Sequence, residues 1–440
     1  MILTFLLVGL SILAIILLTS KFRLQAFIAL FLVSVFLAVT TLPKDKVLTV
    51  LKEGFGGTMA SIGLLIILGA IIGITLDKSG ATISIAKFIL GKTGSNRSAE
   101  AIGMTGFISG IPIFCDSGFI ILSGLARSFS FSSGVAMPFM ASVLATSLYS
   151  VHCLIPPHPG ALAAAGLLEV NIGYLIIAGI LFAIPGVIAA YFWSRWITAK
   201  GDYAPAGING TVASEEKKLP SAFLSFLPIV VPLILITARS FVSLFDTSGD
   251  SVIYKILFFP GEPVFALAIG VILALMLLQN RNAESINSIF INAVEKAGPI
   301  LIITAAGGMF GMVIKSTGSG EALGNVLAGT SLGLAVPFII AVIMKTAQGS
   351  STVAIITTAS FVAPMLSMLG LDSENGRLLA MLSMGAGSMI VSHANDSYFW
   401  VITNFSGIDP GVNLKIYSTS TIVMGITVFL CVFCVSMLVL

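Results

Sequence analysis

Charged residues are scarce in this chain of 440 residues. Lys, Arg, Asp and Glu together make up 9% of it, whereas hydrophobic residues make up 57%. Soluble domains carry about 25% charged residues. The scarcity therefore excludes a soluble globular protein and indicates a polytopic membrane protein. The formal net charge of +3 is too small to indicate nucleic-acid binding.

Cysteine and N-terminal basic residues are also scarce. Four cysteines give no disulfide framework, and Cys431 and Cys434 lie in an apolar run without a polar partner. We therefore expect no metal site and no cofactor. The N-terminus lacks the basic segment and the small-residue cleavage site of a signal peptide, so residues 2–19 are interpreted as a retained first span.

One apolar run, residues 101–125, contains residues that a simple membrane helix avoids. Gly110, Pro112 and Gly118 interrupt it, and Asp116 places an ionisable group near its middle. Such breaks free backbone groups, which at membrane depth must be buried in protein or line a wet cavity. A carboxylate there costs roughly 3 kcal/mol. A broken helix with a charge at the break is typical of transporter binding sites; a kinked helix with Asp116 at the water interface is the alternative.

Apolar runs of about 20 residues divide the chain into two halves with similar plans. The predicted parts are a first repeat (1–200) with a re-entrant hairpin (101–125) and an interrupted span (134–168), a polar cytoplasmic linker (201–220), and a second repeat (221–440) with a hairpin (332–369) and an interrupted span (378–408).

Each half also contains a short amphipathic segment before an apolar span. Residues 44–54 precede the span 58–76 in the first half, and residues 281–296 precede the span 299–314 in the second. We expect residues 44–54 to be a short amphipathic piece between two spans and residues 281–296 to be an amphipathic connector.

The two halves align at an offset of 238 positions, which becomes 241 at the second breaks, where His152 corresponds to His393. Gly69 and Gly73 correspond to Gly307 and Gly311, 238 positions later, and Gly110 then corresponds to Gln348. These Gly-x-x-x-Gly pairs are interpreted as close helix packing. Five crossings in each half are an odd number, so the repeats should be inverted.

The distribution of Lys and Arg agrees with this topology. With both termini outside the cell, 14 of these residues face the cytoplasm and 7 face outward, as the positive-inside rule requires. We predict an all-α polytopic membrane protein built from two inverted-topology repeats of five spans, each with a re-entrant hairpin and an interrupted helix. Continuous spans in place of the hairpins are the less fitting alternative.

The breaks hold the candidate site residues. The hairpin tips contribute Gly110, Pro112, Asp116, Ser117, Lys345, Gln348, Gly349, Ser350, Ser351 and Thr352, and the interrupted spans contribute His152, His158, His393, Asn395 and Asp396.

These residue types suit a hydroxy-carboxylate. Helix N-termini beginning after Asp116 and after Gly349 would present N–H groups to a carboxylate, with Lys345 as a positive charge. Hydroxyl and amide side chains suit a polyhydroxylated body. Candidates for moving protons are Asp116, His152, and the pair His393 and Asp396.

Each feature also has a structural interpretation. Ser350 to Thr352 would then bond neighbouring helices or their own backbone. Lys345 would extend to the interface. His152 and His158, which lie among prolines, would make structural hydrogen bonds.

The break motifs resemble those of a known family. They are Glu53-Gly-Phe-Gly-Gly57, the glycine-spaced run from Gly63 to Gly73, Gly110-Ile-Pro-Ile-Phe-Cys-Asp-Ser-Gly-Phe119, Pro156-Pro-His-Pro-Gly160, Ala347-Gln-Gly-Ser350 with Thr352-Val-Ala354, and Ser392-His-Ala-Asn-Asp396. Together they resemble the gluconate permease family of bacterial inner-membrane symporters over nearly the whole chain.

The resemblance implies proton-coupled uptake of gluconate or related sugar acids, with D-serine taken up by some members. It also implies membership of the ion transporter superfamily, whose folds are inverted-repeat dimers with a moving, elevator-type transport domain. Lys345 stands where an Arg is common in the family, and a lysine is the poorer bidentate clamp for a carboxylate.

The functional hypothesis is a secondary active symporter in the bacterial inner membrane, with a small carboxylate and protons as its partners, the lipid bilayer around it, and a homodimer as its assembly. A sodium-coupled carboxylate carrier, or one for D-serine or glycerate, is the first alternative. An intramembrane enzyme that uses His and Asp is the alternative of a different class, and two equivalent access routes argue against it.

Overall fold

The described part of the chain is helical and contains no strand. The computed structural model describes residues 2–22, 24–93, 97–206, 219–245, 252–317, 333–393 and 396–440. Its helices are α1 (Ile2–Ser20), α2 (Ala26–Thr41), α3 (Lys44–Ser79), α4 (Ala81–Thr93), α5 (Ser98–Gly110), α6 (Cys115–Ser133), α7 (Met137–Leu154), α8 (Pro159–Leu167), α9 (Ile172–Thr198), α10 (Ala222–Phe245), α11 (Val252–Leu257), α12 (Pro263–Leu275), α13 (Ala283–Ser316), α15 (Ala335–Gln348), α16 (Ser351–Val362), η2 (Ala363–Met365), α17 (Glu374–Met389), α18 (Ser397–Ser406), α19 (Pro410–Asn413), η3 (Leu414–Ser418) and α20 (Thr419–Val439). The predicted all-α class is confirmed.

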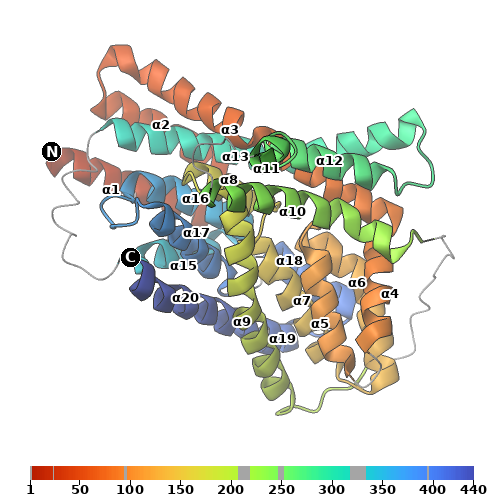
Figure 1. The fold of residues 1–440 in the computed structure, drawn as a ribbon. Helices are drawn as coiled ribbons and strands as arrows, with labels where there is room; N and C mark the ends of the chain where they lie inside the picture. The colour runs from red at the N-terminus through yellow and green to blue at the C-terminus, as the bar shows by residue number, and fades with distance from the viewer. Residues whose placement is uncertain are drawn as a thin grey trace.

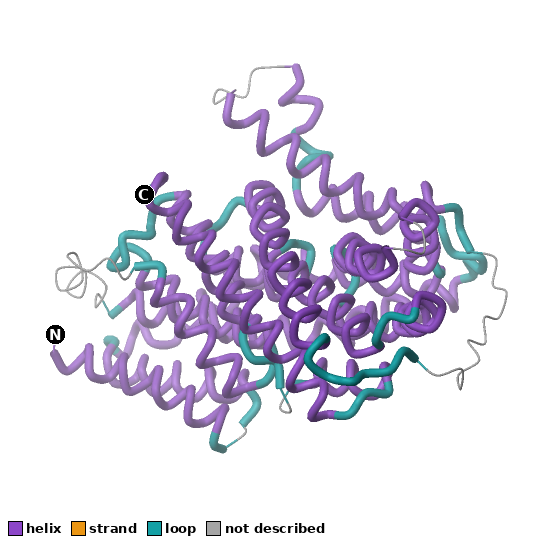
Figure 2. Tube along the Cα trace, turned by 90° about the horizontal axis from the view of Figure 1, so that it is seen from below, coloured by secondary structure: helices purple, strands orange, loops and turns teal. Residues whose placement is uncertain are grey.

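Two long helices, α3 and α13, run side by side along one edge of the molecule, and the broken helices pack beneath them (Figure 1). Glycines make this contact close: a Cβ atom on Gly54 would lie 2.7 Å from Met309 Cα. Both chain termini lie at the same end of the molecule in two perpendicular views (Figures 1 and 2).

Both amphipathic segments continue into the span that follows them, so the prediction of a connector at residues 281–296 was wrong. Residues 44–79 form one helix of 36 residues, bent by 41° near Ser61, and α13 is one helix of 34 residues that contains Pro299. A 36-residue helix is about 54 Å long, which exceeds the hydrocarbon thickness of about 30 Å. The polar N-terminal turns therefore continue the helix beyond the apolar layer.

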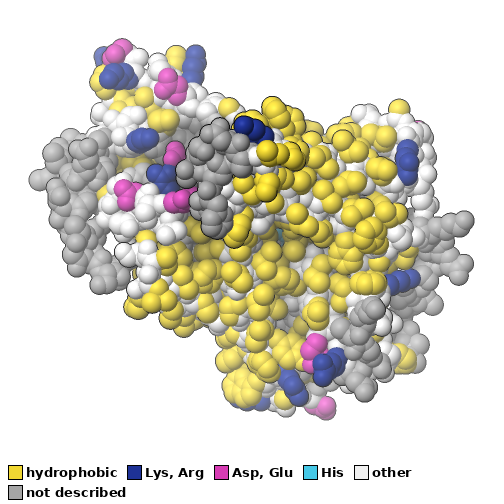
Figure 3. All heavy atoms as spheres, in the orientation of Figure 1, with side chains coloured by type: hydrophobic (Ala, Val, Ile, Leu, Met, Phe, Trp, Pro, Cys, Tyr) yellow, Lys and Arg dark blue, Asp and Glu magenta, His cyan; other side chains and the backbone are white. Residues whose placement is uncertain are grey.

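Several helices are suited to a bilayer. Among the described residues, five helices are long and apolar enough to cross a membrane, or six if the bent α3 is one span, and this count joins α7 with α8. Helices α2, α12, α15 and α16 are apolar but shorter. Hydrophobic side chains form a broad area across one face, with charged side chains at its margins (Figure 3). This surface suits lipid contact.

The interior is built around α7. Every residue of α7 is buried, and it contacts α5, α6, α9 and α17. Small residues permit this: a Cβ atom on Gly110 would lie 2.6 Å from a Val151 methyl carbon, and one on Gly179 would lie 2.6 Å from the Leu154 carbonyl oxygen. Close approach through glycine is the usual means of packing membrane helices.

The first two interruptions follow local sequence signals. Helix α5 ends at Gly110 and α6 restarts at Cys115, with Pro112 between them. Helix α7 ends at Leu154, just ahead of Pro156 and Pro157, because a residue before proline is disfavoured in the α region. Pro159 then begins α8 at a position that needs no N–H donor.

The other two interruptions depend on caps. Gly349 takes a left-handed conformation (φ +79°) that ends α15, and the Ser350 hydroxyl accepts the Val353 N–H at 3.3 Å to begin α16. Helix α17 ends at Met389, and Asp396 caps α18 by accepting the Tyr398 N–H at 3.0 Å. Val391 between them has φ +55°, which is a strained value for a β-branched residue.

Candidate functional site

Side-chain contacts connect all four interruptions. His158 bonds to the Gly110 carbonyl oxygen at 2.6 Å, joining the first break to the second. His152 bonds to Thr352 at 3.1 Å, joining the second to the third. Lys345 and Asp396 join the third to the fourth. Residues far apart in sequence therefore form one polar centre inside an apolar protein.

The centre contains a buried ion pair. Lys345 Nζ lies 2.5 Å from Asp396 Oδ2, and the two side chains are 0% and 5% exposed. Lys345 also donates to the Gly349 carbonyl oxygen at 2.5 Å, and the Ser392 hydroxyl donates to Asp396 Oδ2 at 2.5 Å. Three hydrogen bonds from Lys345, Ser392 and the Tyr398 N–H thus compensate the buried carboxylate.

This pair changes the interpretation of Lys345. Its ammonium group is committed to Asp396 and to a backbone carbonyl, so it does not extend to the interface. Lys345 holds the end of α15 against the start of α18, and its contact with a substrate stays a prediction.

Two histidines form a second cluster. His152 Nδ1 and His158 Nδ1 are 3.2 Å apart, and both residues are buried. The Tyr149 ring stacks on His152 with centroids 6.4 Å apart, and its hydroxyl donates to the Ser388 carbonyl oxygen of α17 at 3.3 Å.

The hairpin tips present polar atoms that find no partner among the described residues. They include Asp116 Oδ1, the Ser109 hydroxyl and both amide atoms of Gln348, all buried. Asp116 is within electrostatic range of Asp396, Lys296 and Lys345. Buried polar atoms without a partner each cost about 1–3 kcal/mol, so they are the groups that a polar ligand would satisfy.

The helix start at the first tip differs from the prediction. We expected α6 to begin after Asp116, but it begins at Cys115, so Asp116 lies in the first turn. Ser117 accepts a hydrogen bond from Lys296 Nζ of α13 at 3.1 Å, and Lys296 also lies 5.3 Å from the Phe114 ring. The start of α16 after Gly349 agrees with the prediction, with Ser351 buried and Thr352 half-buried.

The predicted pair of His393 and Asp396 does not form. These residues lie in a non-helical segment, not one helical turn apart, and the Asp396 carboxylate binds Lys345 instead. Only the backbone joins them, through the Asp396 N–H and the His393 carbonyl oxygen at 2.8 Å. Asn395 lies outside the described residues.

The glycine pair of α3 packs directly on two breaks. A Cβ atom on Gly69 would lie 3.0 Å from the Pro157 carbonyl oxygen, and one on Gly73 would lie 2.7 Å from that of Pro112. The pair does serve close packing, but its partners are the breaks themselves.

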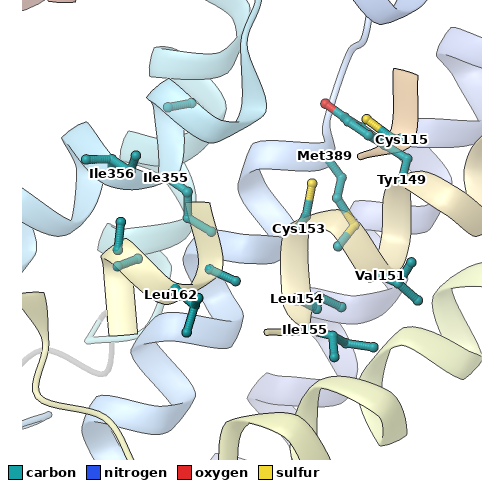
Figure 4. Packing of buried hydrophobic residues seen from close by; sticks show 14 of the residues in the cluster. Cys115, Tyr149, Val151, Cys153, Leu154, Ile155, Leu162, Ile355, Ile356 and Met389 are labelled. Atoms are coloured by element: carbon teal, nitrogen blue, oxygen red, sulfur yellow. The ribbon is translucent and has the colours of Figure 1, made fainter. Parts of the chain in front are cut away.

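Sequence reasoning missed an aromatic group. Tyr149, Tyr398 and Tyr417 are all buried beside the breaks; the first two rings have centroids 5.5 Å apart, and the last two 6.0 Å. The spacing of Tyr149 three residues before His152 could have indicated it, since such residues share a helix face. Cys115, Tyr149, Cys153 and Met389 lie together there, and Leu162 of α8 faces Ile355 of α16 (Figure 4). Apolar packing thus encloses the polar centre.

A cavity of about 480 Å³ lies between α3 and α13 and the C-terminal ends of α8 and α16. We call it the vestibule; its lining includes Thr58, Ser61, Gly307, Gly311, Ser360 and Arg377. Helix α8 has nine residues and runs from the second break to this cavity, a distance of about 13 Å.

This architecture defines a class of protein. Interrupted membrane helices that converge on a buried polar centre are typical of secondary transporters.

The comparisons with known proteins agree with that class. The family model described as GntP family permease matches residues 1–438, and the chain belongs to this family. The inner membrane permease YgbN of Escherichia coli (strain K12) is 34% identical and covers 97% of this chain and 96% of its own. The low-affinity gluconate transporter of the same strain is 30% identical over 94% of each chain.

A solved structure supports the fold. Neisseria gonorrhoeae MtrF, reported to illuminate a class of antimetabolite efflux pumps, superposes with a TM-score of 0.60 at 16% identity, covering 89% of this chain and 84% of its own. This likeness concerns the fold alone. Because the family consists of permeases, the chain is a multi-pass membrane transporter, and the enzyme alternative is set aside.

Proposed function

We propose that this protein imports gluconate or a related sugar acid, together with protons, across the bacterial inner membrane. Membership of the GntP permease family and the 30% identity to a gluconate transporter support the substrate class. The observation that carries the proposal at the site is the set of buried polar atoms of Asp116 and Gln348 at the two hairpin tips, which have no partner in the part of the chain that the structure describes.

In the proposed complex the solute lies between the tips. The Gln348 amide can both donate to and accept from hydroxyl groups. The first turn of α16, from Ser351, offers N–H groups and the positive end of a helix to the carboxylate. Gly110, Pro112 and Gly349 shape the backbone around the solute, and Ser117 and Ser350 border it.

Proton coupling is proposed over sodium coupling because the centre contains titratable side chains. Asp116, His152, His393 and Asp396 remain the candidates. Lys345 already compensates Asp396, which makes Asp116 the carboxylate better placed to exchange a proton.

The transport cycle is proposed to follow the inverted repeat. Helices α3 and α13 would belong to a stationary part, and the hairpins α5–α6 and α15–α16 to a part that moves in an elevator-like manner. Both termini are proposed to face the periplasm, and a homodimer is the proposed assembly.

The test is uptake of labelled gluconate into proteoliposomes with an inward proton gradient. Accumulation that collapses with a protonophore is expected, and Asp116→Asn should abolish accumulation while leaving exchange of gluconate across the membrane. Asp372→Asn, at the rim of the vestibule, is the matched control and should accumulate normally. Accumulation that follows sodium instead of protons, or an Asp116→Asn variant that still concentrates gluconate, would contradict the proposal.

A further inference from the structure

The two clustered histidines form the middle of a continuous chain of three hydrogen bonds. It runs from Thr352 Oγ1 to His152 Nε2 (3.1 Å), from His152 Nδ1 to His158 Nδ1 (3.2 Å), and from His158 Nε2 to the Gly110 carbonyl oxygen (2.6 Å). The chain therefore spans three of the four helix breaks.

The last acceptor determines the direction of the whole chain. A backbone carbonyl oxygen can only accept, so His158 Nε2 must carry a hydrogen. In neutral His158 the Nδ1 atom is then an acceptor, so His152 Nδ1 must donate to it. This leaves Nε2 of neutral His152 as an acceptor, and the Thr352 hydroxyl must donate. One arrangement of hydrogens satisfies every atom: His158 protonated on Nε2 and His152 on Nδ1.

One added proton has one place in this chain. A second hydrogen between the two Nδ1 atoms would face the one already there, whereas His152 Nε2 has only a lone pair directed at Thr352 Oγ1. A proton at His152 Nε2 turns that atom into a donor, so the Thr352 oxygen must accept. The Thr352 hydroxyl hydrogen is then released to point elsewhere.

Charged and titratable groups surround the histidine pair on several sides. Lys345 of α15 opposes a positive charge on His152, and Asp396 pairs with Lys345. Asp116 of α6 lies within electrostatic range of both Lys345 and Asp396. Tyr149 and Cys153 of α7 lie beside His152, α3 meets this region with Gly69 and Gly73, and α16 meets it with Ser351 and Thr352. The excess proton thus enters a site with charges of both signs nearby.

Thr352 is placed to contact the proposed solute. It is half-buried in the first turn of α16, four residues beyond Gln348, whose amide atoms are buried and find no partner among the described residues. Its Cα packs on α8, where a Cβ atom on Gly160 would lie 3.2 Å away, so the residue is held in position.

We propose that Thr352 couples proton binding to solute binding through the His152–His158 pair. With the pair neutral, the Thr352 hydroxyl donates to His152; with one proton added at His152 Nε2, the hydroxyl donates to the solute carboxylate. Because coupling is reciprocal, a bound carboxylate favours the protonated pair by the same factor that the proton favours the carboxylate. This inference rests on the proposed function and adds Thr352 and His158 as coupling residues.

The first test determines which ring nitrogen of each histidine carries a hydrogen. The chain has three histidines, so nitrogen-15 NMR of histidine-labelled protein gives few signals, and His393→Gln serves only to identify the third. At high pH we expect one histidine protonated on Nε2 and one on Nδ1, the latter rare in free histidine. Two Nε2-protonated residues in the pair would overturn the inference, whatever the substrate proves to be.

The second test measures the coupling between proton binding and solute binding. Calorimetric titration of gluconate into purified protein, in two buffers with different ionisation enthalpies, counts the protons taken up on binding. Wild type and Thr352→Ser should take up one proton and bind more tightly as pH falls. Thr352→Val should take up one proton fewer than wild type, and its affinity at low pH should fall about tenfold, which is within the usual range of coupling factors.

The outcomes separate the two proposals. Proton uptake equal to that of wild type in a folded Thr352→Val protein overturns the coupling role of Thr352 and leaves the proposed function standing. A wild type that binds no gluconate contradicts the proposed substrate, and the tautomer spectra then decide the histidine chain on their own. Thermal unfolding of both Thr352 variants verifies that they are folded.

Discussion

The polar centre and the rim of the vestibule each contain an ion pair, and their surroundings differ. At the centre, Lys345 and Asp396 are 0% and 5% exposed, whereas Arg377 and Glu169 at the vestibule are 28% and 73% exposed. A buried pair loses most of its hydration and depends on its partner; an exposed pair keeps water as an alternative partner. The buried ion pair at the centre therefore stabilises the fold, whereas the exposed pair at the vestibule contributes little to stability.

Glycines at matching positions of the two halves also differ in what surrounds them. Gly73 of α3 packs against the Pro112 carbonyl oxygen, whereas Gly311 of α13 lines the vestibule and would place a Cβ atom 3.5 Å from the Ser360 carbonyl oxygen. Gly73 therefore meets a close backbone contact, whereas Gly311 borders a cavity.

The largest difference is expected between the ion pairs. Lys345→Met should lower the free energy of unfolding by about 3–5 kcal/mol, because it leaves the Asp396 carboxylate buried without its counter-charge. Arg377→Gln should lower it by less than about 1 kcal/mol. Unfolding in detergent micelles measures both values. Equal losses in the two variants would contradict the contrast between centre and rim.

A smaller difference is expected between the glycines. Gly73→Ala should destabilise the protein by about 1–3 kcal/mol, since its methyl group would meet a backbone oxygen at 2.7 Å that cannot move alone. Gly311→Ala meets ordinary contacts and should change the free energy of unfolding by less than about 0.5 kcal/mol. A Gly73→Ala protein as stable as wild type would mean that α3 does not press on the first break.

The smallest effect on stability is expected from a pair of cysteine substitutions. They test from which side of the membrane the vestibule is accessible. Ser61 is exposed and lines the vestibule, whereas Thr75, further along the same helix, is fully buried. In a background without Cys431 and Cys434, a membrane-impermeant maleimide should label Ser61→Cys and not Thr75→Cys. Labelling from outside intact cells would agree with the predicted topology; labelling only from the cytoplasmic side would reverse it.

The fold class and the helix interruptions could be predicted because their causes are local. Low charge, apolar runs and the positions of Pro112, Pro156 and Gly349 act within a few residues of the chain, so they can be read in order. The connector at residues 281–296 was predicted wrongly for a related reason: a change of polarity along a helix does not end it, and α13 continues through.

The sequence predicted which residues belong to the candidate site but not which of them bind one another. His393 and Asp396 are close in sequence, yet Asp396 binds Lys345, 51 residues away, and His152 binds Thr352, 200 residues away. Such partners depend on how the halves pack. Tyr149 and Lys296 were missed because the search for site residues followed helix interruptions, and an aromatic residue or a lysine does not interrupt a helix.

The sequence by itself determined that this protein is helical, lies in a membrane, and interrupts four of its helices with polar residues, since composition and backbone chemistry act locally. Only the tertiary structure decided which polar groups compensate one another, because a buried charge or hydrogen-bonding atom must find its partner in space. Packing therefore pairs Lys345 with Asp396 and connects Thr352 to Gly110 through the two histidines. It leaves Asp116 Oδ1 and the Gln348 amide without a partner among the residues that the structure describes.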